Sequence, residues 1–415
     1  MIFMNIRVEA VKLLCRWERG GVFAESLVES AAEEHRLSSQ DRSLLTALVM
    51  GVLRNKSWFD YLIDSMRKAG RLEIEVRQLL RLGLCQILVM KVPPHAAVNE
   101  TVKLASRQVA GLVNALLRRT LREESSIRSA QSALPLPLRY STPEWLVNHW
   151  TECFGESAVE ALLRRQQEIP SLYARRNPAL PLSRTTESAG LVALEDVPGW
   201  YKVDGPLPVE DLRSGALYIA DPSTRFAVEL LAPGKGEKIL DACAAPGGKS
   251  AGILMATAGA VHLVATDAAE HRLPRLEDNL EKLVSSEGSL VTEVFDWAAP
   301  CPDKWKGAFD AVLLDVPCSN SGVTQRRVDV RWRLTMKEIK RLSRLQLQIL
   351  ESASQAVAEG GRLVYSTCSI DPQEDFEVVR EFLASHPEWK LAEEKRVLPF
   401  ESEADGAYAA RLVRC

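Results

Sequence analysis

The sequence lacks the features of a secreted or membrane protein. Its eight cysteines are scattered through 415 residues, with no CxxC pair and no cysteine–histidine cluster at the spacing of a zinc site. Neither a disulfide framework nor a bound metal is therefore expected, and a reducing cytoplasm is predicted. The N-terminal segment has no long apolar core and carries charges at Arg7, Glu9 and Lys12, so neither a signal peptide nor a membrane span is expected.

The overall charge does not indicate a nucleic-acid-binding protein either. The 52 basic and 55 acidic residues leave a net charge of −3, so any RNA-binding surface must be a local patch. The length exceeds what one hydrophobic core usually supports, and two or three domains are predicted.

The N-terminal part of the chain is predicted to be an all-helical domain over residues 1–125. Apolar residues recur at intervals of three and four from residue 5 to about 124, which is typical of about seven short amphipathic helices. Arg118 and Arg119 lie on the last of these helices. They either contact RNA or belong to a solvent-facing helix surface, and the charge pattern leaves both interpretations open.

Two segments are expected between this domain and the C-terminal part. Residues 126–139 are rich in serine, alanine and proline and predict a linker. Residues 140–212 begin with a helical pattern and continue into short strand-like pieces, which predicts a small α+β subdomain. Its basic residues are candidates for RNA phosphate contacts, although a solvated helix explains part of them equally well.

From residue 213 to 415 the sequence repeats an order of apolar run, turn and helix. This order predicts a parallel, doubly wound, Rossmann-like sheet, in which the carboxyl ends of the strands form the site. The expected strands are residues 237–243, 261–267, 290–295, 308–316 and 361–366, with two more at 389–393 and 408–413.

The stretch 239–250 is the expected centre of that site. An apolar strand ends at Asp241, a loop of small residues follows, and a helix begins near Gly247. The final Gly248-Lys249-Ser250 resembles a phosphate-binding P-loop, but Cys243 stands where that loop needs a glycine. The spacing does not fit a dinucleotide site either, which favours a loop that binds S-adenosylmethionine (SAM).

Acids and cysteines follow the ends of the other predicted strands. Asp267, Asp296 and Asp315 end three of them, which suits a cofactor with a ribose, an adenine amine and a cationic centre. Cys318 and Cys368 each lie in a polar turn after a core strand. Such a pair suits addition of a thiolate to carbon 6 of a pyrimidine, which makes carbon 5 able to accept a methyl group, while Asp315 steadies a proton at N3.

These motifs together resemble the RNA 5-methylcytosine methyltransferases, and more closely their bacterial Fmu/Sun/RsmB branch, which acts on 16S ribosomal RNA. The resemblance rests on residues 241–250, on Asp315-Val-Pro-Cys318-Ser and on Ser-Thr-Cys368-Ser-Ile. Residues 7–124 are similar to a NusB-like RNA-binding domain, with Gly-Val-Leu-Arg54 and Val-Asn-Glu100 among the recognisable pieces.

The resemblance implies specific roles. Cys368 would form the covalent adduct, Cys318 would assist release, and the target cytosine would be flipped or single-stranded. The residues expected to contact SAM are Asp241, Cys243, Ala244, Ala245, Pro246, Gly247, Gly248, Lys249, Asp267, Arg272, Asp296 and Asp315. Two departures, Asn320-Ser321 and Val328-Asp329, are expected to alter RNA contacts without touching the two cysteines.

A basic segment downstream of Cys318 is the expected RNA surface. It contains Arg326, Arg327, Arg331 and Arg333 around Trp332 and continues to Arg344, which suits a phosphate track with a stacking platform. A solvated helix face with a packed tryptophan is the alternative. The predicted protein is a monomeric RNA cytosine-5 methyltransferase; a transfer RNA enzyme and a non-catalytic ribosome assembly factor remain the rival hypotheses.

Overall fold

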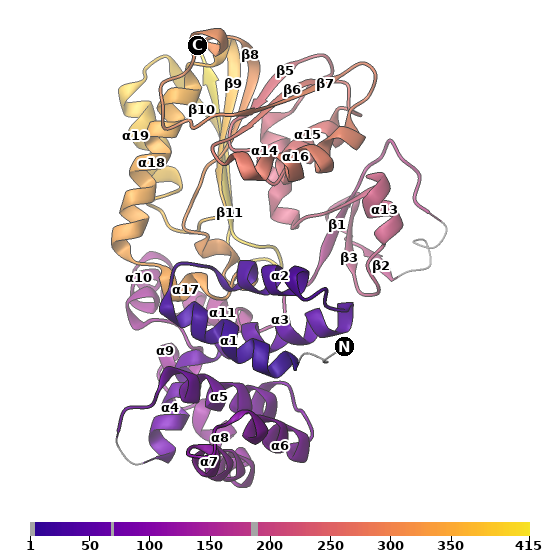
Figure 1. Cartoon of the computed structure of the whole chain (residues 1–415). Helices are drawn as coiled ribbons and strands as arrows, with labels where there is room; N and C mark the ends of the chain where they lie inside the picture. The colour runs from indigo at the N-terminus through magenta and orange to yellow at the C-terminus, as the bar shows by residue number, and fades with distance from the viewer. Residues whose placement is uncertain (1–4, 68–69, 184–189) are drawn as a thin grey trace. The chain divides into compact units, whose positions relative to one another are not determined.

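The computed structural model describes residues 5–67, 70–183 and 190–415, which fall into two compact units (Figure 1). The helical unit comprises residues up to Glu168 together with Thr324–Arg333. The sheet unit comprises Ile169–Val323 and Leu334–Cys415. Residues 184–189, where strand-like pieces were expected, and residues 1–4 lie outside the described part.

The helical unit is built from amphipathic helices around one apolar core. Leucine and valine at intervals of three and four bury one face of each helix, and residues such as Leu14, Leu48 and Leu80 are fully enclosed. The bounds are α1 Ile6–Arg19, α2 Ala24–Glu34, α3 Ser39–Arg54, α4 Lys56–Met66, α5 Ile74–Leu84, a π-helical turn Cys85–Val89, α6 Pro94–Leu104, α7 Ala110–Arg122, α8 Glu124–Gln131, α9 Leu136–Arg139, α10 Glu144–Phe154, α11 Glu156–Arg165 and α17 Val330–Arg333. The predicted all-helical N-terminal domain is confirmed, with α1 to α7 inside residues 5–124.

Two expected boundaries are wrong. The segment 126–139 is not an extended linker, because α8 and α9 occupy most of it and Ile127 packs into the helical core. The expected subdomain 140–212 is divided, since α10 and α11 belong to the helical unit and the strands that follow belong to the sheet unit. Serine and proline are compatible with short helices whose stability comes from packing, and composition alone does not show this.

The segment Thr324–Arg333 joins the helical unit from far along the chain. Val328 lies in the helical core with no exposed surface. The Asp329 carboxylate accepts hydrogen bonds from the Trp17 indole at 3.0 Å and from the backbone N–H of Ala24 at 2.7 Å. The chain therefore leaves the sheet unit after Val323, completes the helical unit, and returns at Leu334.

The described residues of the sheet unit form two sheets. The smaller has strand order β2-β3-β1-β4 with antiparallel pairing, and the larger has order β10-β11-β9-β8-β5-β6-β7. The strands are β1 Tyr173–Arg176, β2 Leu191–Ala193, β3 Trp200–Val203, β4 Leu217–Ile219, β5 Lys238–Asp241, β6 His262–Asp267, β7 Ser289–Val294, β8 Phe309–Asp315, β9 Val357–Thr367, β10 Trp389–Val397 and β11 Ala407–Arg414.

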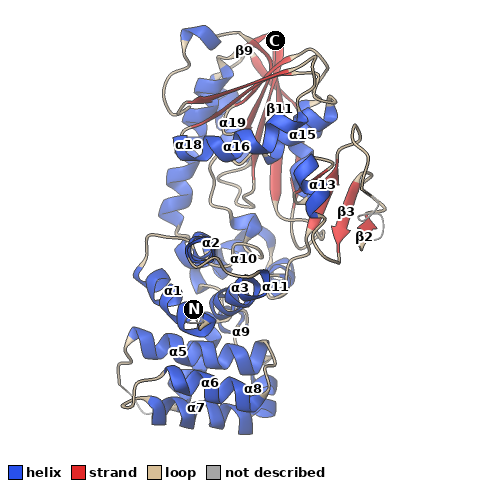
Figure 2. Cartoon of the chain, turned by 45° about the vertical axis from the view of Figure 1, so that its right-hand side comes forward, coloured by secondary structure: helices blue, strands red, loops and turns tan. Residues whose placement is uncertain are grey.

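The large sheet forms the middle of a three-layer sandwich. Strands β5 to β9 pair in parallel, and β11 and β10 add antiparallel strands at one edge, so the predicted Rossmann-like sheet is confirmed with a mixed edge (Figure 2). One face packs against α14, α15 and α16, and the other against α18 and α19. The helices of this unit are α13 Val209–Ser214, α14 Arg225–Leu231, α15 Gly248–Ala256, α16 Leu273–Leu280, α18 Met336–Ser354 and α19 Phe376–Ser385, with 3-10 turns at Pro222–Thr224, Glu270–Arg272, Glu281–Leu283, Asp303–Trp305 and Ser321–Val323.

Within 5–67, 70–183 and 190–415, no helix is both long and apolar enough to cross a membrane.

We predict that Asp329→Ala destabilises the helical unit by about 2–3 kcal/mol, because two buried donors lose a charged acceptor. Hydrogen exchange of α1 and α2 measures this change separately from the sheet unit. Glu25→Ala is the matched control: it removes the exposed ion pair with Arg327 on the same segment and should change protection little. Equal protection in Asp329→Ala and the wild type would contradict the prediction.

Candidate functional site

The site lies where the strand order of the large sheet reverses. From β5 the chain proceeds to β6 and β7 on one side, and then crosses to β8 and β9 on the other. The loops after β5 and β8 therefore diverge and leave a crevice at the carboxyl ends of these strands, where ligands bind in doubly wound sheets. Asp241 ends β5 and Asp315 ends β8, so both predicted acids flank this point.

The loop after β5 surrounds a buried carboxyl group. Ser250 on α15 donates a hydrogen bond to Asp241 Oδ2 at 2.5 Å, while Asp241 Oδ1 is buried without a hydrogen-bond partner. Burial raises the pKa of Asp241 to about 7. Gly247 has φ +105° and a Cβ there would lie 3.0 Å from Leu276, so this turn requires glycine. The sequence indicated Asp241 but not the part played by Ser250.

The same loop is tied to the end of β6. Asp267 accepts hydrogen bonds from the backbone N–H of Ala245 at 3.2 Å and of Ala269 at 2.9 Å. Arg272 forms an ion pair of 4.0 Å with Asp267 from the following 3-10 turn. Asp296, beyond β7, is exposed and accepts from the Ala298 N–H at 2.9 Å. Asp267 and Arg272 are thus brought to the loop, whereas Asp296 bonds within its own turn and acts on Cys243 only through its charge.

The loop residues differ in how much of them faces solvent. Cys243 is partly buried with Ala244 behind it, and burial raises the pKa of the Cys243 thiol well above its usual value. Pro246 precedes the glycine pair Gly247-Gly248, where α15 begins. Residues 243–248 therefore carry no charged side chain, and a ligand here would meet backbone groups and small side chains.

Lys249, in the helix that follows the β5 loop, forms an ion pair with the residue that ends β8. Its ammonium lies 2.6 Å from Asp315 Oδ2, and the Ser366 hydroxyl donates to Asp315 Oδ1 at 3.1 Å. Burial lowers the pKa of Lys249, but the charge and hydrogen bond of Asp315 outweigh burial and leave it raised. Lys249 therefore remains an ammonium that holds the Asp315 carboxylate in one orientation.

The two predicted cysteines meet. Strands β8 and β9 pair in parallel with Asp315 beside Ser366, so the turns that follow carry Cys318 and Cys368 to an Sγ–Sγ distance of 3.2 Å. The hydrogen bond with Cys368 and then burial raise the pKa of Cys318 well above its usual value. Cys318 therefore remains a protonated thiol next to Cys368.

A buried glutamate fixes the two cysteine turns to each other. Glu374 accepts from the Ser319 N–H and from the Ser369 hydroxyl, both at 2.8 Å. Burial raises the pKa of Glu374. Glu374 was not among the predicted site residues, and its signal in the sequence is the run of acids Asp371, Glu374 and Asp375 ahead of α19.

One expectation about the departures from the family pattern is wrong. Asn320 contacts both cysteines: its amide Nδ2 donates to the Cys318 carbonyl at 3.0 Å, and its Oδ1 accepts from Cys368 Sγ at 3.3 Å. Side-chain contacts across a turn depend on the backbone angles of the turn, which a sequence motif does not specify.

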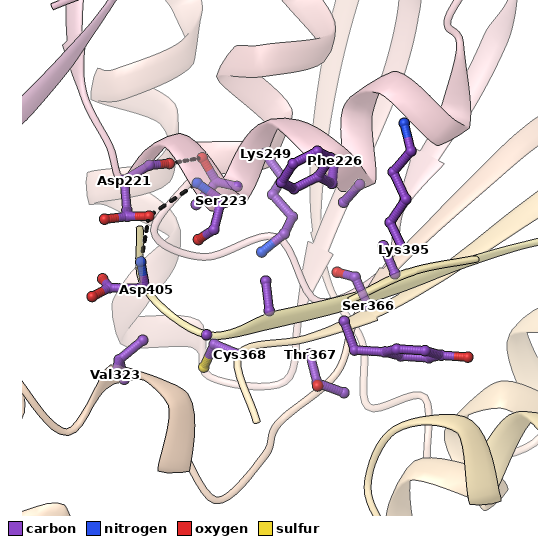
Figure 3. A pocket seen from close by; sticks show the side chains of 16 residues that line it. Asp221, Ser223, Phe226, Lys249, Val323, Ser366, Thr367, Cys368, Lys395 and Asp405 are labelled. Atoms are coloured by element: carbon purple, nitrogen blue, oxygen red, sulfur yellow. Dashed lines mark hydrogen bonds between the residues drawn. The ribbon is translucent and has the colours of Figure 1, made fainter. Parts of the chain in front are cut away.

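Cys368 also lines a pocket of the sheet unit. Its walls include Lys249, Phe226 and Lys395, with Asp221 and Asp405 at one end, where the Asp405 N–H donates to Asp221 Oδ1 at 3.0 Å (Figure 3). The pocket therefore combines a thiol, an aromatic ring, ammonium groups and carboxylates in one place.

The predicted basic track is largely wrong. Arg331 has no exposed surface and donates to the Tyr140 carbonyl and the Thr142 hydroxyl at 3.4 Å and to the Thr324 carbonyl at 3.2 Å. Burial lowers the pKa of Arg331 to about 9. Arg333 donates to the Val22 carbonyl at 2.6 Å. Both side chains bind backbone of the helical unit, so neither is a phosphate contact.

Trp332 is not a stacking platform, because it packs on the helical core and its indole donates to the Leu53 carbonyl at 3.0 Å. Arg326 is half-buried, and Arg327 is exposed beside Glu25 at 3.6 Å.

On the helical unit, Arg118 and Arg119 both lie on α7. Arg118 is exposed and donates to Asn114 at 2.9 Å, and the half-buried Arg119 donates to Glu123 at 2.9 Å. Both remain candidates for RNA contact.

Comparison with known proteins matches both units. The 16S rRNA methyltransferase RsmB/F family matches residues 228–413, and the NusB family matches residues 4–122. Ribosomal RNA small subunit methyltransferase B of Cronobacter sakazakii and that of Escherichia coli are each 32% identical to the chain over 406 residues, covering 92% of both proteins.

Solved structures share the fold. The crystal structure of PH0851 covers 99% of both chains with a TM-score of 0.77 at 22% identity. NSun6 from Pyrococcus horikoshii, crystallised with SFG, covers 66% of this chain and 98% of its own with a TM-score of 0.56 at 19% identity. At these identities the likeness concerns the fold alone.

Fold and sequence together define a methyltransferase whose Rossmann-like sheet unit follows a NusB-type helical region. More narrowly, the chain belongs to the family of the ribosomal RNA small subunit methyltransferases B.

The raised pKa of Asp241 predicts a pH-dependent stability. Because its folded-state value of about 7 lies above the ordinary 3.8, its stabilising contribution is complete below about pH 4 and is lost as the pH rises through 7. Asp241→Asn should remove a fall on the order of 2–4 kcal/mol across this window, measured by urea unfolding at a series of pH values. Asp278→Asn on the exposed surface of α16 should leave the fall unchanged. An identical slope in Asp241→Asn and the wild type would show that burial does not shift this group.

Proposed function

We propose that the protein is a SAM-dependent methyltransferase that forms 5-methylcytosine in 16S ribosomal RNA through a covalent adduct at Cys368. The observation that carries the proposal is the pair of thiols, 3.2 Å apart, beside the carboxylate of Asp315 at the reversal of strand order. The family relationship supports a ribosomal RNA substrate.

The residues of the loop after β5 fit SAM. Asp241 Oδ1 is a buried acceptor without a partner, which a donor group of a ligand would satisfy. Asp267 lies one strand further at the position that receives a ribose hydroxyl in this type of sheet, and the Gly247-Gly248 turn allows close approach of the backbone. SAM would supply the methyl group. The chain's residues would bind its ribose and amino-acid ends.

The chemistry then follows from the two sulfur atoms. The Cys368 thiolate adds to carbon 6 of the cytosine, and the electron pair of the broken ring double bond makes carbon 5 the nucleophile. Carbon 5 takes the methyl group that SAM would supply, and the electron pair of the broken methyl–sulfur bond would stay on the donor's sulfur. Water takes the proton from carbon 5, and the electron pair of that C–H bond restores the ring double bond as the bond to the Cys368 sulfur breaks. Cys318, kept as a thiol by its raised pKa, donates its proton to the departing Cys368 sulfur. Asp315 steadies the proton at N3.

The pocket beside Cys368 supports entry of an unstacked base. A base within a helix exposes neither face of its ring, so the cytosine must be flipped or single-stranded to reach the sulfur. Phe226 offers a stacking surface, and Lys395 offers positive charge to the RNA backbone (Figure 3). A transfer RNA substrate would use the same pocket, and the relatives' ribosomal RNA activity favours 16S RNA over it. We infer a cytoplasmic monomer.

Cys318→Ser should accumulate a protein–RNA adduct that survives denaturing electrophoresis, because the adduct forms at Cys368 and its release is impaired. Cys368→Ala should lose methylation by at least about a thousandfold and form no adduct. Cys415→Ser, at an exposed cysteine, is the control and should behave as the wild type. Undiminished methylation by Cys368→Ala would disprove the mechanism. Absence of methylation by the wild-type protein would instead favour the rival of a non-catalytic ribosome assembly factor.

A basic stripe on α18 replaces the rejected part of the track as the proposed RNA surface. Lys337, Lys340 and Arg344 are exposed at helical spacing on the sheet unit. Lys337→Ala with Lys340→Ala should weaken RNA binding and reduce the slope of log affinity against log salt by about one per lysine. Lys304→Ala with Lys306→Ala, exposed lysines elsewhere on this unit, is the charge-matched control. An unchanged slope in the first pair would exclude the stripe.

A further inference from the structure

We infer that Asn320 is a positioning residue for the nucleophile, which aims the Cys368 thiol and fixes the Cys318 turn with one amide group. The inference rests on the proposed function for its meaning in catalysis. Its structural basis is the pair of contacts that the Asn320 side chain makes, 3.0 Å to the Cys318 carbonyl and 3.3 Å to Cys368 Sγ.

The partners of the amide determine its orientation. A carbonyl oxygen is only an acceptor, so the amide nitrogen must face Cys318. The amide oxygen is then directed at Cys368 and accepts its S–H. The thiol hydrogen of Cys368 thus has a fixed acceptor, and the sulfur is restricted to one side-chain conformation.

The backbone explains why asparagine suits this position. Asn320 has φ +60°, in the left-handed region that glycine and asparagine adopt more readily than other residues. This angle turns the side chain back over the cysteine turns. The residues on either side of Asn320, Ser319 and Ser321, are buried, and their hydroxyl groups form hydrogen bonds with the Ser369 hydroxyl. These bonds fix the backbone of Asn320. A rigid turn with one amide between two sulfur atoms is suited to positioning the attacking atom.

The contact also separates the roles of the two cysteines. At 3.2 Å the sulfur atoms are close enough to compete for the same incoming carbon. The Asn320 side chain contacts the Cys368 thiol and the Cys318 carbonyl, and the Asn320 backbone N–H also bonds to the Cys318 thiol. The amide therefore fixes the direction of the Cys368 sulfur, which is the sulfur that lines the pocket.

Three substitutions separate positioning from folding. Asn320→Gly keeps the left-handed backbone and removes the amide, and should lower the single-turnover methylation rate about three- to tenfold while RNA affinity changes less than about twofold. Asn320→Asp keeps the shape and places a negative charge beside the sulfur, which disfavours the thiolate. Its rate–pH profile should therefore move to higher pH, whereas the Asn320→Gly profile should keep its position. Asn320→Ala also removes the amide but places a Cβ at a left-handed φ. The difference in rate between Asn320→Ala and Asn320→Gly therefore measures the effect of backbone strain.

Alkylation of Cys368 by iodoacetamide in the RNA-free protein, located by peptide mass spectrometry, gives a readout that does not depend on the reaction. Asn320→Gly should change this rate relative to the wild type, with Cys415 as the internal reference. Wild-type methylation and alkylation rates in Asn320→Gly, or an unmoved pH profile in Asn320→Asp, would overturn the inference. Methylation that persists in Cys368→Ala would instead overturn the proposed function, so the two failures are distinguishable.

Discussion

The parallel pairing of β8 with β9 is the constraint on which the site depends. Its register sets Asp315 beside Ser366. β8 ends at Asp315 and β9 at Thr367, so a cysteine follows each strand end within a few residues. Two sulfur atoms that are 50 residues apart in sequence thereby come within 3.2 Å. A slip of one residue would reverse the faces of the side chains on β9 and separate the turns. The packing of the strands on α18 and α19 therefore protects the chemistry as well as the core.

Several carboxyl groups are buried near the site, where burial disfavours their charged forms. Asp241 and Glu374 have raised pKa values because burial disfavours their charged forms, and Asp375 shows the same direction. Each is offset in part by hydroxyl or N–H donors, as Ser250 does for Asp241 and Ser319 for Glu374. Perturbed groups gather at functional sites because orientation and charge there serve a ligand rather than stability. Here they lie at the strand ends, while the strand interiors are apolar.

The sequence predicted the sheet unit well because its signals are local. Each strand is a short apolar run that ends in a polar residue, and the carboxyl ends of parallel strands share one edge, so Asp241, Asp267 and the two cysteines could be assigned without coordinates. Charge patterns were less informative. The sequence does not distinguish Arg331 and Arg333 from surface arginines. Only the fold shows that Arg331 is fully buried and that both side chains donate to backbone carbonyl groups. Asn320 and Glu374 were missed for a related reason, because their roles depend on turn geometry and on contacts between distant segments.

The ten residues Thr324–Arg333 bear on how this protein is made. Val328 packs in the core of the helical unit, and Asp329 accepts a hydrogen bond from the Trp17 indole. Both residues are synthesised well over a hundred residues after Glu168. At roughly 5–20 residues per second, the first helices wait on the order of ten seconds or more for the piece that completes them. An exposed apolar groove persists during that time, and the usual order of domain-by-domain folding during synthesis does not apply. The helical unit is therefore completed only after β1 to β8 of the sheet unit have been synthesised.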